Sequence, residues 1–160
     1  MPMRKRVIRT APTEAQPSEQ GWLDLEEGAE VEVTSEDAAR PIEAALVPGD
    51  ESGWRAAQPG PQTIRLLFDH PQRVSRVWLL FIEADTARTQ EFVLRWSPDG
   101  GRSFREIVRQ QWNFGPPETT REVEDYRVEL DGVTALELAI VPDRSGGEAR
   151  ASLARWRLAA

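Results

Sequence analysis

The chain has 160 residues, with a hydrophobic fraction of 39% and a charged fraction of 29%, which are ordinary values for one folded globular domain. Its 20 basic and 27 acidic residues give a net charge of -7, so it lacks the basic field of proteins that collect nucleic acids or dock on anionic membranes. It contains no cysteine, which excludes disulfides, thiol catalysis and thiolate zinc sites.

Residues 1–20 are polar, contain prolines at positions 2, 12 and 17, and include the basic group Arg4-Lys5-Arg6. We expect them to form a flexible N-terminal arm. They hold no apolar run of signal-peptide length, and 18 successive apolar residues occur nowhere in the chain. The expected location is therefore cytoplasmic. Residues 21–160 show no second boundary and are expected to form a single β-sandwich binding domain.

Beyond the arm, apolar residues recur with a period of two, not 3.6, which predicts strands. A short strand is expected at 31–33. Residues 41–46 (PIEAAL) suit a helical turn, because the proline stands at its first position. The next strand covers 64–68 and is expected to end at His70-Pro71, where a turn follows.

Residues 77–82 (VWLLFI) are apolar on both faces, which predicts a central strand that is covered on both sides, or a strand whose outer face meets a loop or the N-terminal arm. The strand at 92–96 runs into Ser97-Pro98-Asp99-Gly100-Gly101, a sequence typical of a hairpin turn, and Phe104 begins the next strand. Later strands are expected at 126–130, ended by Gly132, and then at 136–140 and 153–158. About eight strands with almost no helix indicate an antiparallel sandwich or barrel.

The order of several pieces is informative. A helical turn precedes Asp50-Glu51-Ser52-Gly53-Trp54, and a strand ending in Phe68-Asp69 follows; then come 71–81 (PQRVSRVWLLF) and 92–104 (FVLRWSPDGGRSF). From about residue 30 to its C-terminus the chain resembles the discoidin, or coagulation factor 5/8 type C, family of galactose-binding-like jelly rolls. That family includes sugar-binding modules of bacterial enzymes. The resemblance implies an all-β jelly-roll sandwich whose loops at one end bind a ligand.

Family members usually carry Asp-Gly and then Thr-x-Trp in the first loop, and in sugar-binding members this loop often holds a structural calcium, helped by a Glu on the last strand. Here Glu51 stands at the Gly position and the Thr is missing. The last strand reads SLARWRL, with Ala154 and Arg155 near the Glu position. We therefore expect the protein to fold without a metal and without any other cofactor.

Catalytic groups are hard to assemble from this sequence. His70 is the only histidine, and it reads as a turn residue, so neither a Ser-His-Asp triad nor a histidine metal cluster is available. Glu122 and Glu124 lie two apart and share one strand face, which is expected to be solvated. No phosphate-cradling glycine loop is present. We expect a protein that is not an enzyme.

Two polar stretches are candidate ligand sites. Residues 83–90 (EADTARTQ) link two strong strands, and Arg88, Thr89 and Gln90 offer a planar donor fork, a hydroxyl and an amide, which suit hydroxyl or carboxylate recognition. A salt bridge from Arg88 to a neighbouring carboxylate is the structural alternative. Trp54 and Arg55, in the first loop, are also candidate contacts.

The second stretch is RQQWNFGPP, residues 109–117, which combines aromatic rings with amides, as sugar sites do. We expect it to begin as strand and to end as loop at Gly115-Pro116-Pro117. Trp112 should then be buried, whereas Asn113 and Phe114 should lie at the sandwich end and contact a ligand. The alternative is that the strand runs on to Phe114 and both rings close the end of the sandwich.

The preferred function is a non-catalytic module that binds a carbohydrate or a small polar ligand through loops at one end. The alternative is an intracellular protein-interaction or assembly subunit with a vestigial cleft. Neither nucleic acid nor a membrane is an expected partner. The candidate ligand-binding residues are Trp54, Arg55, Arg88, Gln90, Asn113 and Phe114.

Overall fold

The structure, a computed structural model, describes residues 21–47 and 52–160. The arm expected at residues 1–20 and the loop residues Asp50 and Glu51 lie outside the described residues. In the described part no helix is long and apolar enough to cross a membrane. In chain order the elements are α1 (Leu25–Gly28), β1 (Ala29–Val33), α2 (Glu43–Leu46), β2 (Trp54–Arg55), β3 (Gln62–Ile82), β4 (Arg88–Ser97), β5 (Arg105–Phe114), β6 (Arg121–Val141), β7 (Ser152–Leu153) and β8 (Arg155–Ala159).

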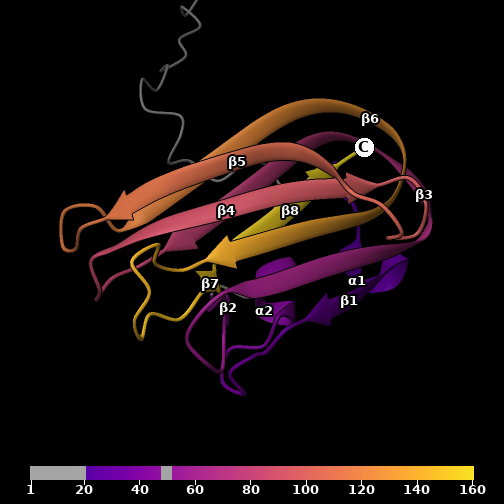
Figure 1. The fold of residues 1–160 in the computed structure, drawn as a ribbon. Helices are drawn as coiled ribbons and strands as arrows, with labels where there is room; N and C mark the ends of the chain where they lie inside the picture. Colours follow the sequence, from indigo (N-terminus) through magenta and orange to yellow (C-terminus); the bar gives the residue numbers. More distant parts are fainter. Residues whose placement is uncertain (1–20, 48–51) are drawn as a thin grey trace, which may run out of the picture.

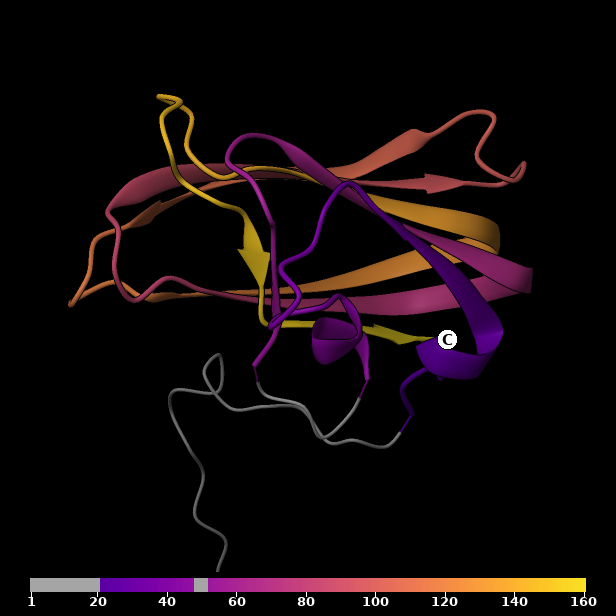
Figure 2. The same ribbon diagram turned by 90° about the horizontal axis from the view of Figure 1, so that it is seen from below.

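Two long strands, β3 and β6, contribute to both layers of a sandwich. The first half of β3 lies between β1 and the second half of β6, which also pairs with β4, and β4 pairs with β5. The second half of β3 pairs with the first half of β6 and with β8. Because both strands bend between their halves, one antiparallel sheet folds over itself into two facing layers (Figures 1 and 2).

The expectation that His70-Pro71 ends a strand is wrong. β3 continues through both residues, and its pairing with β6 shifts register between Leu67 and Arg76. Proline cannot donate to the ladder, so the pairing is disrupted locally and the strand can bend into the second layer. Gly132 likewise lies inside β6, with a φ of 66°. It joins two segments that the sequence predicts as separate strands.

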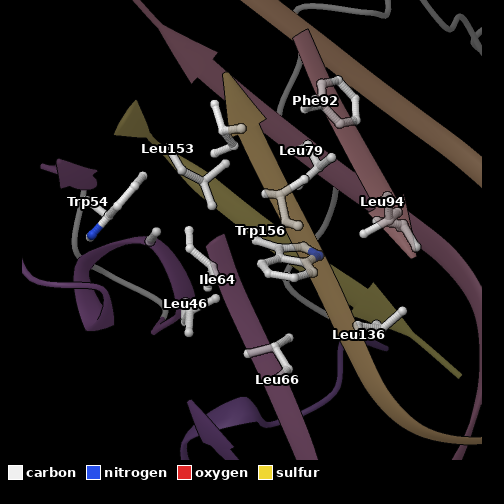
Figure 3. Close-up of a cluster of buried hydrophobic side chains, with 14 of the residues drawn as sticks. Leu46, Trp54, Ile64, Leu66, Leu79, Phe92, Leu94, Leu136, Leu153 and Trp156 are labelled. Carbon is white, nitrogen blue, oxygen red and sulfur yellow. The ribbon is translucent and has the colours of Figure 1, made fainter. Parts of the chain in front are cut away.

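The core lies between the layers and contains the apolar positions of the period-two pattern. Ile64 and Leu66 of β3 are 0% exposed, as are Leu136 of β6 and Trp156 of β8. Figure 3 shows the Trp156 indole among aliphatic side chains from β3 and β6. The alternation read from the sequence therefore identifies the buried face of these strands.

Residues 77–81 are covered on both faces, as predicted, whereas Ile82 at the end of β3 is exposed. Trp78 and Leu80 point away from the core, yet they are only 4% and 3% exposed. On this outer side, Arg155 of β8 is paired directly with Leu80 and donates a hydrogen bond of 3.1 Å to the carbonyl oxygen of Ala44 in α2. Segment α2 is thus held against the outer face of the second layer (Figure 2).

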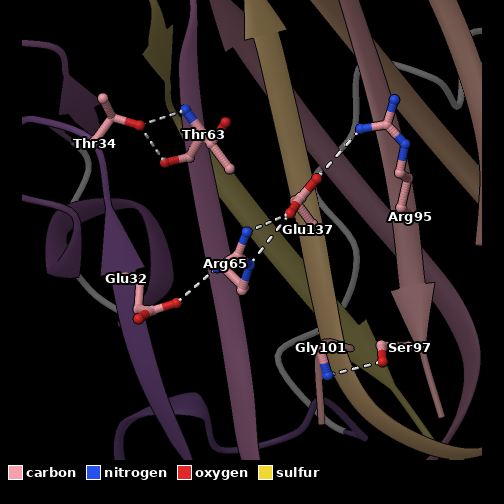
Figure 4. Close-up of polar contacts among 8 residues, drawn as sticks. All are labelled: Glu32, Thr34, Thr63, Arg65, Arg95, Ser97, Gly101 and Glu137. Atoms are coloured by element: carbon pink, nitrogen blue, oxygen red, sulfur yellow. Dashed lines mark hydrogen bonds and ion pairs between the residues drawn. The ribbon is translucent and has the colours of Figure 1, made fainter. Parts of the chain in front are cut away.

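The turn between β4 and β5 has the predicted form. Gly100 and Gly101 have φ values of 76° and 90°, a region that residues with a Cβ rarely adopt. The Ser97 hydroxyl accepts a hydrogen bond from the Gly101 amide at 2.9 Å (Figure 4). Asp99 accepts a hydrogen bond from the Ser103 amide at 2.9 Å. These contacts hold the β4–β5 hairpin, whose connection spans residues 98–104, at one end of the sandwich.

Alternating charges cross the outer face of the first layer (Figure 4). Arg65 of β3 contacts Glu137 of β6 at 2.7 Å and Glu32 of β1 at 3.0 Å. Arg95 of β4 contacts the other oxygen of Glu137 at 3.2 Å. The four side chains satisfy one another across four strands, so this face is stabilised by its own ion pairs.

Candidate functional site

Three of the residues expected to contact a ligand lie inside the sandwich. The Arg88 side chain is 0% exposed, Gln90 is 0% exposed and Phe114 is 3% exposed. Arg88 and Phe114 are direct partners across β4 and β5. All three side chains face the space between the layers, where a ligand arriving from solution does not meet them.

Two of the three guanidinium nitrogens of Arg88 donate hydrogen bonds to other groups of the protein. Its Nε lies 2.8 Å from Glu83, and its Nη1 donates to Gln90 at 3.0 Å and to the Pro142 carbonyl oxygen at 2.8 Å. Burial acts to raise the pKa of Glu83, but the hydrogen bonds from Arg88 and from two backbone amides outweigh it and leave this pKa below its ordinary value. The salt bridge that was the alternative to ligand binding is the arrangement found.

The stretch RQQWNFGPP follows the alternative that closes the sandwich. β5 runs to Phe114, and Trp112 and Phe114 share its inner face. Phe114 is the more buried ring, whereas Trp112 is only partly buried, so the expected division of roles between the two rings is reversed. Asn113 is exposed on the outer face and accepts a hydrogen bond of 2.8 Å from the Thr89 hydroxyl. It is accessible, but it does not line the hollow to which Arg55 contributes.

The expectation of a solvated face for Glu122 and Glu124 is wrong, because both carboxyls point into the sandwich. They pair directly with Phe81 and Leu79 of β3, whose side chains belong to the core. Burial, followed by the charge of Glu124, raises the pKa of Glu122 to about 8. Gln90 donates to one Glu122 oxygen at 3.0 Å, and the other oxygen has no hydrogen-bond partner. Neither carboxyl is placed to act on a substrate in solution.

Trp54 and Arg55 are neighbours on the two-residue strand β2, so their side chains point to opposite sides. Trp54 is 1% exposed and its indole donates a hydrogen bond of 3.0 Å to the Ser35 carbonyl oxygen. Arg55 is exposed. Of the six residues expected at a ligand site, Trp54 and Arg55 are the two that line a hollow of the surface, and of these only Arg55 is exposed.

That hollow consists of two adjoining parts at the end of the sandwich where β3 passes into β4. One has a volume of about 260 Å³ and the other of about 450 Å³, and they share Arg55, Glu83 and Arg150. Their walls come from β2, from the 83–87 loop and from the 142–151 loop. We call this hollow the end groove.

Cations without partners surround the smaller part of the end groove. Arg40, Arg55 and Arg150 line it, and within the described part of the chain their guanidinium groups make no hydrogen bond or ion pair. Ile82, which is 39% exposed and is the exposed large hydrophobic side chain of the described residues, lines the same part. An exposed carboxylate, Asp85, completes its polar wall. The arrangement offers donor forks around an apolar patch.

Sequence reasoning missed Arg40, Arg150 and Ile82. Each is an isolated residue in its own segment, and nothing in its local pattern separates it from the other arginines or the other strand residues. Only the packing of β2 beside β7 and of two long loops brings them to one hollow. The signal that could have been used is the resemblance, which implied loops at one end of the sandwich.

The residues near the expected calcium position do not fit a metal. Arg155 is 6% exposed, and its Nη1 donates to the carbonyl oxygens of Ala44 at 3.1 Å and Val47 at 3.5 Å. Arg157 donates to the carbonyl oxygen of Leu46 at 3.0 Å. Guanidinium groups, which carry positive charge, thus stand at this position and bind the carbonyl oxygens at the end of α2. In residues 21–47 and 52–160 no group of three acidic or histidine side chains could hold an ion.

Comparison with known proteins finds similarity in the fold and not in the sequence. No protein-family model matches the chain, and no curated protein matches it in sequence. Among solved structures, the module CpGH89CBM32-5 from Clostridium perfringens, in complex with GalNAc-β-1,3-galactose, is similar with a TM-score of 0.63 and 17% identity. This match covers 87% of the present chain and 99% of the other.

Two further solved structures are similar to the same extent. The family 32 carbohydrate-binding module of C. perfringens NanJ, in complex with galactose, has a TM-score of 0.62 and 16% identity over 86% of the present chain and 97% of its own. The family 32 module of AlyQ, in complex with 4,5-unsaturated mannuronic acid, has a TM-score of 0.61 and 15% identity over 82% and 95%. The chain therefore has the galactose-binding-like jelly-roll fold, which confirms the fold expected from the sequence.

Proposed function

We propose that the chain is a non-catalytic module that binds a carbohydrate or a similar small polar ligand in the end groove. The observation that carries this proposal is a set of three arginines, Arg40, Arg55 and Arg150, that make no ion pair among the described residues and surround one exposed apolar side chain. Guanidinium groups donate in a planar fork to hydroxyl and carboxylate oxygens, and an apolar patch packs against the C–H faces of a ring.

The fold supports this proposal by analogy. The similar modules CpGH89CBM32-5 and that of NanJ were solved in complex with a disaccharide and with galactose. A shared sandwich does not by itself assign a ligand, because one fold carries many functions. The groove adds the local argument, since it is a hollow with donors and an apolar surface on the same wall.

The carboxyl groups support a role in binding over one in catalysis. Glycosidic hydrolysis generally uses two carboxyl groups that flank the scissile bond. The carboxyl pair of Glu122 and Glu124, which share one strand face, points into the interior. Glu83 lines the end groove, but its carboxylate forms a salt bridge with the buried Arg88. The remaining acceptors are suited to receive hydrogen bonds from sugar hydroxyls.

A glycan array probed with the purified protein tests this proposal. We expect binding to one class of glycans and its loss in Arg55→Ala. Arg102→Ala is the matched control, because Arg102 is exposed on the β4–β5 hairpin at the other end of β4 and its removal changes the net charge equally. A blank array, or binding that survives Arg55→Ala and Arg150→Ala together, would contradict the proposal and favour a protein partner.

A further inference from the structure

We infer that the end groove selects a saccharide that carries a carboxylate, that is, a uronic acid unit, with Arg55 and Arg150 pairing with the acid group. This inference rests on the proposed function and names the ligand class of that site. It follows from the ion pairing of the arginines, from the surface around them and from the charge balance of the chain.

Several arginines elsewhere in the sandwich have acidic partners, whereas the exposed Arg102, Arg121 and Arg127 make no ion pair among the described residues. Arg65 and Arg76 each lie 2.7 Å from a carboxylate, and Arg88 lies 2.8 Å from one. In a chain with 27 acidic and 20 basic residues, a carboxylate is seldom far from an arginine. Arg55 and Arg150 line both parts of the end groove and still make no ion pair among the described residues. They differ from the other arginines without an ion pair because they line one hollow together with Arg40, where a guanidinium can bind a ligand carboxylate in a bidentate fashion.

The other groups on the groove suit a sugar ring rather than a bare anion. Ile82 offers an exposed apolar surface beside the arginines. Ser152 and Thr86 place hydroxyls on the two parts of the groove, and Asp85 and Glu148 place exposed acceptors there. Acceptors of this kind bind hydroxyl protons and repel free anions. The volume of the larger part, about 450 Å³, lies within the range of small-ligand sites, roughly 300–1,000 Å³.

The same charges limit how large an anionic ligand can be. The net charge of the whole chain is -7, and Asp143 and Glu148 stand on the far part of the groove. A long polyanion would meet this negative field along its length, whereas a short uronate places one acid group among Arg40, Arg55 and Arg150. The geometry therefore favours recognition of a single acid unit within an oligosaccharide.

Titration calorimetry with defined trisaccharides tests the inference. The probes are the trisaccharides of galacturonic, mannuronic and guluronic acid, each beside its methyl ester, which keeps the ring and hydroxyls and removes the charge. Acetate and inorganic phosphate serve as anions without a sugar. We expect one acid to bind at least about tenfold more tightly than its ester and than either simple anion.

Variants of the groove arginines show whether the preference for the acid over the ester arises at these residues. Arg55→Gln and Arg150→Gln should each weaken binding of the acid by about tenfold and leave the ester unchanged, because glutamine keeps a hydrogen-bond donor and loses the charge. Arg102→Gln removes one positive charge at the remote hairpin and should change neither. Melting temperatures within the range of the parent protein would show that each variant is folded.

The outcomes separate this inference from the proposed function. Equal affinity for acid and ester would overturn the inference, and so would acid binding that is unchanged in Arg55→Gln and Arg150→Gln. Neither result would contradict the proposed function, because a neutral sugar could still bind in the groove. Phosphate or acetate binding as tightly as the trisaccharide would also overturn the inference, since the groove would then be a general anion site. A blank across both the trisaccharides and the glycan array would overturn the proposed function as well.

Discussion

The guanidinium carbon of Arg88 lies 4.7 Å from the centroid of the Phe114 ring. The two residues are directly paired on β4 and β5, and both are buried. A desolvated cation over an aromatic face is worth about 2 kcal/mol, more than the same contact at an exposed site. The pair thus stabilises the interior near the end of the sandwich, and neither residue is available to a ligand.

Removing the ring should therefore destabilise the protein. We expect Phe114→Ala to lower the free energy of unfolding by about 3–5 kcal/mol, because it leaves a cavity and uncovers Arg88. Trp112→Ala should cost less, since this ring is only partly buried, and Asn113→Ala should cost about 0.5 kcal/mol or less. Urea denaturation of the three variants measures this order. A Phe114→Ala variant no less stable than Asn113→Ala would contradict the buried placement.

The carboxyl of Glu122 should make stability depend on pH. Its pKa is raised to about 8 in the folded protein from an ordinary value near 4.5, so folding favours the protonated form. The corresponding stability is fully present below about pH 4.5 and is lost as the pH rises through about 8. Between pH 5 and pH 9 we expect the parent protein to lose more than about 1 kcal/mol from this group.

Glu122→Gln should remove most of that loss, because the amide is neutral throughout the range. The urea midpoint of this variant, measured from pH 5 to pH 9, should fall less steeply than that of the parent. Glu118→Gln, an exposed glutamate in the turn after β5, removes the same charge and serves as the control. Parallel curves for the parent and Glu122→Gln would show that the carboxyl does not titrate in this window.

The segment α2 should be held by arginine and not by a metal. Arg155→Met keeps an apolar stem of similar length and removes the donor to the Ala44 carbonyl oxygen, so it should cost about 1.5–3 kcal/mol. The measurement is the free energy of unfolding, with Arg102→Met as an exposed control. A loss no larger than that of the control would mean that the contact contributes nothing.

Metal removal should leave the parent protein unchanged. An ion that binds only the native state raises the melting temperature by mass action, and a chelator that removes the ion would lower the melting temperature. Because guanidinium groups already bind the carbonyl oxygens of α2, we expect equal melting temperatures in calcium and in chelator. A fall of several degrees in chelator would show that a metal contributes to the fold.

The β4–β5 turn should require its glycines. Gly100 and Gly101 have φ values of 76° and 90°, where a β-branched residue is strained. Gly100→Val and Gly101→Val should each lower stability by roughly 1 kcal/mol or more. Gly28→Val is the control, because that glycine has no positive φ and open space around it. Unchanged melting temperatures in both hairpin variants would contradict the turn geometry.

The sequence by itself determined the fold class and much of the core. Alternation at a period of two marked Ile64 and Leu66 as buried positions, because successive side chains of a strand point to opposite faces. The double apolar face of residues 77–82 predicted a strand covered on both sides, and Ser97 to Gly101 predicted the hairpin. These features depend on neighbours along the chain, so local pattern is enough to find them.

Tertiary structure alone decided which polar residues face inward and where the groove forms. Glu122 and Glu124 occupy alternate positions, as the residues of a solvated strand face do. Only their pairing with Phe81 and Leu79 shows that their side chains point into the core. Arg88 is a plausible surface residue until Glu83 and the Phe114 ring enclose it. Periodicity specifies that two faces differ but not which of them a second layer covers. The end groove depends still more on packing, since its arginines come from three separate segments: Arg40, Arg55 and Arg150.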